Sequence, residues 1–208
     1  MTNRFNKENH LHLLEDLAPS SRVAVAAAAL ERMSVGYAIW AQEKRCSPVE
    51  SILDDVWAYA SLEGSLPDAK FIESLYPDPG APATLESPYA ESFVEALQLL
   101  GLFASTQETM RLVEVLQAAY NMSDNAAGDV LVRYNDPQFD HRLTSDMDRL
   151  MSTHPWVDRE LAAQRMDIAE AQLSSDLRSL IGHLRTRARA HPVVSASELD
   201  EIRTFQAG

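Results

Sequence analysis

Two charged neighbours, Glu31 and Arg32, directly follow the longest apolar run of the chain, residues 23–30. An unpaired buried charge is very costly, so each side chain must reach water or find a partner on another element. Adjacent residues on a helix point about 100° apart, so these two do not face each other. Two alternatives stay open: ion pairs to other helices, or a polar ligand pocket with Tyr37 or Trp57 as a wall.

The six histidines show no pattern that is typical of a metal site. A di-iron bundle uses Glu-x-x-His pairs, but none of the residues three positions before a histidine is Glu. These residues are Lys7, Asn9, Gln138, Met151, Leu180 and Ala188. The chain also lacks a glycine-rich phosphate loop, a nucleophile elbow and a His-Glu-x-x-His motif. We therefore predict no metal and no cofactor, and the sequence leaves open whether the protein is an enzyme.

The net charge of -13 disfavours nucleic acid and anionic membrane surfaces as partners. One segment differs, because residues 177–197 contain no acid and hold Arg178, Arg185, Arg187 and Arg189. Basic residues suit the negative end of a helix dipole, and a phosphate-binding patch is the alternative. The apolar run 23–30 is shorter than the roughly 20 residues that span a bilayer. Together with the lone Cys46, this predicts a cytoplasmic protein without a membrane segment.

The composition and the positions of proline and helix-capping residues predict helices throughout the chain. The chain has 28 Ala and 25 Leu against 19 Val plus Ile, and its ten prolines fall between the apolar-periodic segments. Capping boxes are predicted at Ser105–Glu108 and Ser195–Glu198, and His154 before Pro155 is expected to cap a helix. The predicted helices cover residues 8–18, 21–44, 48–63, 67–75, 88–104, 106–121, 123–134, 137–151 and 156–190.

The last of these helices carries an apolar stripe whose spacing alternates between three and four residues. It could form the spine of the bundle or a seam for a second subunit. The stripe consists of Ala162, Met166, Ala169, Leu173, Leu177, Leu180 and Leu184. The irregular segment 76–88 is expected to connect two helical halves, with a lid over a site as the alternative.

Two stretches of the sequence resemble the YjaG-like bacterial family, domain of unknown function family 416. The first is Leu30-Glu31-Arg32-Met33 with Tyr37, followed by Ile52-Leu53-Asp54 and Trp57. The second is His154-Pro155-Trp156-Val157 with Glu160-Leu161 and Gln164. The resemblance covers roughly residues 10 to 190, and Val35-Gly36 departs from the family's Pro-Asn. It implies a small all-helical bacterial protein and no particular activity.

We thus predict an all-α, single-domain bundle of about eight to nine helices with a long C-terminal helix, over residues 1–208. Residues 191–208 form a tail with a weak helix. The expected function is that of a self-associating interaction module without catalytic activity, which forms a homo-oligomer or binds another protein. The alternative is a small-ligand-binding protein or enzyme, whose candidate ligand-binding residues are Glu31, Arg32, Tyr37 and Trp57.

Overall fold

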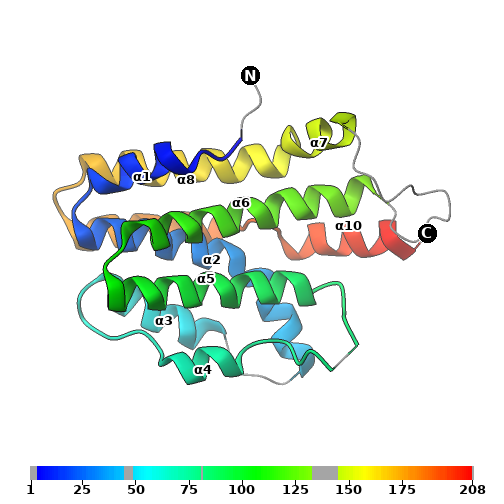
Figure 1. The fold of residues 1–208 in the computed structure, drawn as a ribbon, viewed down its shortest axis with the longest axis horizontal. Helices are drawn as coiled ribbons and strands as arrows, with labels where there is room; N and C mark the ends of the chain where they lie inside the picture. Colours follow the sequence, from blue (N-terminus) through cyan, green and yellow to red (C-terminus); the bar gives the residue numbers. More distant parts are fainter. Residues whose placement is uncertain (1–3, 45–48, 81, 133–144, 208) are drawn as a thin grey trace.

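The computed structural model describes residues 4–44, 49–80, 82–132 and 145–207. This part of the chain forms ten α-helices and no β-strand (Figure 1), which confirms the predicted all-α fold. The helices are α1 (Lys7–Glu15), α2 (Pro19–Lys44), α3 (Val49–Ala60), α4 (Ala69–Ser74), α5 (Ser87–Thr106), α6 (Thr109–Leu131), α7 (Ser145–Ser152), α8 (Pro155–Leu173), α9 (Leu177–Ala190) and α10 (Ala196–Ala207).

Helix α2 runs through the middle of the bundle. It packs against α3, α5, α6, α8, α9 and α10. Its residues 23–30 are all buried, as predicted for a helix that is apolar on every side. By length and composition Pro19–Gln42 would also qualify as a membrane span, but 78% of its most apolar window is buried inside the bundle. A helix in the core of a globular protein can have the same length and apolar composition as a membrane span.

The predicted long helix over 156–190 is wrong, because the chain breaks between α8 and α9. The hydroxyl of Ser174 donates to the carbonyl of Asp176 (3.0 Å), and the Asp176 carboxylate accepts from the N–H of Arg178 (3.1 Å). Asp176 is thereby the N-cap of α9. After the break α9 packs along α2. The apolar stripe is divided: Leu180 and Leu184 enter the core, whereas Met166 and Leu173 stay 50% and 88% exposed.

Two further boundaries differ from the prediction. Ser105 and Thr106 belong to the last turn of α5, because Gln107 ends that helix in the left-handed region at φ 58° and Glu108 caps α6. The predicted capping box at Ser105–Glu108 is therefore wrong. The two helices predicted at 106–121 and 123–134 are joined in the structure, because α6 continues without a break through residues 109–131. The hydroxyl of Ser123 donates to the carbonyl of Tyr120 (2.7 Å), so this serine stays inside the helix.

The predicted capping box before α10 is confirmed. The Ser195 hydroxyl accepts from the N–H of Glu198 (3.3 Å), and the Glu198 carboxylate accepts from the N–H of Ser195 (2.7 Å). The predicted weak terminal helix is thus a regular element whose Leu199 and Ile202 are buried. His154 caps α8 as predicted, accepting from the N–H of Trp156 (3.4 Å). Cys46 and the predicted helix residues 137–144 lie outside the described residues.

Candidate functional site

Arg32 is the largest side chain that the core encloses completely. It lies on α2 and faces α8. Its Nε and Nη2 donate to the two carboxylate oxygens of Glu160 at 2.8 and 3.0 Å, and its Nη1 lies 2.5 Å from Oδ2 of Asp167. Burial opposes the ionisation of Arg32, but the two carboxylates outweigh burial and raise its pKa. This is the inter-helix ion pair of the first alternative, and it is confirmed.

The two acids that bind Arg32 share one face of α8 with a buried glutamine. Glu160, Gln164 and Asp167 stand at positions i, i+4 and i+7, and all three are buried. The Gln164 amide donates to Glu160 Oε1 (2.8 Å) and to the backbone carbonyl of Leu116 on α6 (2.9 Å). The arrangement therefore ties three helices, α2, α6 and α8, at one point.

A second arginine approaches the same site from α9. Arg187 donates from Nε and Nη2 to Oδ1 of Asp167 (2.9 and 2.7 Å) and from Nη1 to Glu170 (2.8 Å). His183 Nδ1 lies 2.8 Å from the other oxygen of Glu170. Burial alone would raise the pKa of Glu170, but the hydrogen bonds from Arg187 and His183 outweigh it and lower that pKa.

Glu31 takes part in a second cluster, which joins α2 to α3 and α9. The indole N–H of Trp57 donates to its Oε2, and Nε of Arg189 donates to its Oε1 (2.6 Å). Arg185 lies 3.7 Å from Glu31 and also pairs with Asp54 on α3. Three of the four arginines in the basic segment thus bind carboxylates of this chain, and Arg178 lies 4.0 Å from Glu63 on the surface.

The four candidate ligand-binding residues do not share one site. Glu31 and Trp57 are hydrogen-bonded, and Arg32 belongs to the other cluster. Tyr37 is buried among aromatic rings, with Phe93 at 4.8 Å and Trp40 at 5.6 Å between ring centroids. A ligand role for these residues stays a prediction.

The formal charges of the two clusters cancel except for one carboxylate. Arg32 and Arg187 face Glu160 and Asp167, while Arg185 and Arg189 face Glu31 and Asp54. Each set holds two guanidiniums and two carboxylates, and Glu170 adds one carboxylate at the edge. Such a balanced set is chemically suited to fixing how α2, α8 and α9 pack. Among the described residues, no group of three His, Cys, Asp or Glu side chains could hold a metal ion.

Reasoning from sequence missed Asp167 as a partner of Arg32, and Arg187 as the second partner of Asp167. The available signal was a polar face at 160, 164 and 167 on a helix whose other positions are largely apolar. A second signal was the acid-free segment 177–197, whose arginines required acids elsewhere.

No protein-family model and no curated protein matches the sequence. The fold is similar to the crystal structure of a DUF416 family protein from Shewanella baltica, with a TM-score of 0.70 and 14% sequence identity. The match covers 89% of this chain and 95% of that one. The two proteins therefore share a fold over nearly their whole lengths, which confirms the predicted resemblance at the level of structure.

Proposed function

We propose that this chain is a bacterial relative of the DUF416 proteins and works as a self-associating interaction module without catalytic activity. The relationship to these proteins is supported by the shared fold. It is also supported by a contact between the two sequence stretches that resemble the family. Arg32 of the first stretch is bound by Glu160 of the second, which Gln164 holds in turn. The single observation that carries self-association is an apolar stripe on the outside of α8.

The outer stripe of α8 consists of Ala162, Met166, Ala169 and Leu173. Their spacing of four, three and four places them on one side of the helix, away from the face that binds Arg32. Met166 is 50% and Leu173 88% exposed, and Ala169 is exposed as well. Large apolar side chains grouped on a surface helix are typical of a protein contact.

The stripe is complementary to a second copy of itself. An antiparallel pair of α8 helices, related by a two-fold axis between residues 167 and 168, places Ala162 opposite Leu173 and Met166 opposite Ala169. Each large side chain then meets a small one, which allows close helix packing. We therefore favour a symmetric dimer over a contact with an unrelated surface.

The net charge of the chain and the burial of α2 bear on its location and its partners. A net charge of -13 disfavours nucleic acid as a partner, and the lone Cys46 fits the proposed cytoplasmic location. The burial of α2 supports a chain that does not cross a membrane. Because two copies repel each other, added salt should strengthen the dimer by screening this repulsion. A ligand pocket or enzyme site near Glu31 and Arg32 is less well supported, because both side chains are held by other charges of the chain.

Sedimentation velocity at micromolar concentration tests the proposal. We expect a dimer whose dissociation constant rises at least about tenfold in Met166→Glu, because a carboxylate would be buried against Ala169 of the second copy. Leu102→Glu is the matched control, since Leu102 is similarly exposed (46%) but lies on α5. A monomer at all concentrations and salt conditions, or a dimer that only Leu102→Glu disrupts, would contradict the proposed interface.

A further inference from the structure

Helices α3, α4 and α5 lie together at one edge of the bundle (Figure 1). Residues of these three helices line an apolar cleft. Its volume is about 640 Å³, within the range of small-molecule sites. The walls come from the end of α3, the loop 64–67, α4 and the second half of α5, and include Leu66, Pro67, Ile72 and Leu102. The cleft is thus a preformed, mostly apolar space outside the charge clusters.

Gly101 keeps part of this space open. It lies inside α5, where glycine is among the least favourable residues. A Cβ at this position would meet only Ile72 Cδ1, at an ordinary contact distance of 3.7 Å. Packing therefore does not require glycine here, and the effect of its missing side chain is to widen the cleft.

A strained, exposed leucine shortly precedes part of the cleft wall in the sequence. Leu62 follows α3 with φ 63°, in the position of a Schellman motif where glycine is usual. Its N–H donates to the carbonyl of Tyr59 (3.1 Å), and the N–H of Glu63 donates to that of Ala58 (2.9 Å). Its side chain is nevertheless 77% exposed, two residues before Gly64 of the cleft wall. A strained backbone that presents an apolar side chain to solvent is typical of a functional site.

One exposed large apolar side chain belongs to the wall of the cleft itself. Leu102 on α5 is 46% exposed. Leu102 therefore extends the apolar surface of the cleft to its solvent-exposed edge. An apolar molecule that enters the cleft would therefore stay in contact with the protein beyond the opening.

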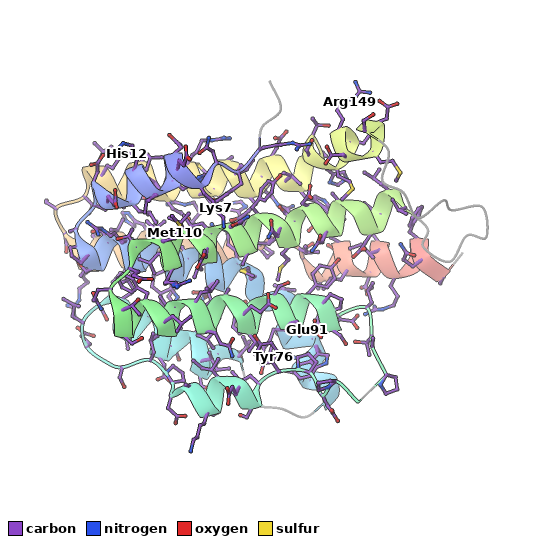
Figure 2. All side chains as sticks on the ribbon, viewed as in Figure 1. Lys7, His12, Tyr76, Glu91, Met110 and Arg149 are labelled. Atoms are coloured by element: carbon purple, nitrogen blue, oxygen red, sulfur yellow. The ribbon has the colours of Figure 1, made fainter. Side chains whose placement is uncertain are left out.

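The charge around the cleft is negative. Glu73 is the one charged residue among the described residues of its wall. At one end, the Tyr76 hydroxyl donates to the side-chain carbonyl of Gln98 (3.0 Å), which lines the cleft. Tyr76 lies near Glu91 (Figure 2), and its pKa is raised by burial and by the carboxylates of Glu95 and Glu91. An anionic ligand would be repelled from these surroundings, whereas an ammonium group would find a partner in Glu73.

We propose that this cleft binds a small hydrophobic molecule that carries an amine, with the ammonium group at Glu73 and the hydrocarbon part against Ile72, Gly101 and Leu102. The site lies on a different face from the outer stripe of α8, so binding does not depend on self-association. A fatty acid has the matching hydrocarbon part but the opposite charge, and the cleft excludes it.

Calorimetric titration of the full chain with nonylamine, nonan-1-ol and nonanoate, each below its micelle concentration, tests the proposal. The three probes share one hydrocarbon chain and differ in head group. We expect saturable binding of one molecule per chain, tightest for the amine and absent for the carboxylate. Equal affinity for amine and carboxylate, or no saturable binding of any probe, would overturn the proposal.

Two pairs of variants locate the binding. Gly101→Leu fills the cleft and should weaken amine binding at least about tenfold. Gly182→Leu makes the same change in α9, where an added Cβ would meet nothing within 4 Å, and should leave binding unchanged. Glu73→Gln should remove the preference for amine over alcohol, whereas Glu8→Gln on α1 removes the same charge elsewhere and should not. Unchanged binding in Gly101→Leu would place the probe outside the cleft and refute the proposal.

Discussion

Arg32 and Asp167, which are 135 residues apart in the sequence, meet inside the bundle at 2.5 Å between Nη1 and Oδ2. Neither side chain is exposed to solvent. Asp167 uses its other oxygen to accept from Arg187, so one carboxylate joins α2, α8 and α9. A buried ion pair adds little net stability compared with apolar residues, but removing one member leaves the other charge without compensation. The pair therefore specifies how these helices pack.

Replacing Arg32 with methionine should destabilise the protein strongly. The variant leaves Glu160 buried without its guanidinium and Asp167 with Arg187 alone, so we expect a loss of about 3–5 kcal/mol in the free energy of unfolding. Urea unfolding followed by circular dichroism measures it. Arg178→Met is the control, because Arg178 is 92% exposed and should change the free energy of unfolding by less than about 0.5 kcal/mol. A small effect in Arg32→Met would instead favour a ligand role for this arginine.

The sequence shows that Glu31 and Arg32 need charged partners, but it does not show which residues these partners are. A charge after a fully apolar run must be compensated, whereas Glu160 lies 128 residues from Arg32 and is chosen by the packing of α8 on α2. The apolar periodicity of the sequence also did not reveal the break between α8 and α9. Leu173 and Leu177 are four residues apart, so the apolar pattern stays in phase across Ser174–Asp176. Local hydrogen bonds of Ser174 and Asp176 decide the break.

Replacing Leu62 with glycine should stabilise the protein. Leucine in the left-handed region is disfavoured by about 1–2 kcal/mol, and glycine gives back about 0.5–1 kcal/mol through its larger unfolded-state entropy. We expect a net gain of up to about 1 kcal/mol in the free energy of unfolding. The same change in an α5 interior position, Leu102→Gly, should destabilise the protein, because glycine is unfavourable inside a helix. A loss of stability in Leu62→Gly would mean that the exposed side chain makes a stabilising contact.

Asp124 on α6 should oppose folding at neutral pH. Burial, and next the carboxylate of Asp148, raise its pKa, while Arg4 acts in the opposite direction. A carboxyl whose pKa is higher in the folded state costs stability above its unfolded pKa, and this cost disappears as the pH falls and both states become protonated. Asp124→Asn should therefore have a higher thermal midpoint than the parent chain at pH 7 and the same midpoint near pH 3. Equal midpoints at both pH values would contradict the raised pKa.

Glu198 should have the opposite pH dependence, because its pKa is lowered in the folded state. Burial acts to raise this pKa, but hydrogen bonds from Arg159 and from the Ser195 backbone N–H outweigh it. Its contribution to stability is therefore complete above the ordinary value of 4.5 and is lost as the pH falls through the lowered folded value.

Glu198→Gln tests this contribution. The amide cannot take part in the ion pair with Arg159 at any pH, so the variant should be less stable than the parent chain at pH 7 and lose less stability on acidification. Glu201→Gln is the control for removing a charge from the same helix, because Glu201 also lies on α10 and is exposed. Thermal unfolding from pH 7 to pH 3 distinguishes the cases: parallel curves for Glu198→Gln and the parent chain would show that this capping pair does not respond to pH.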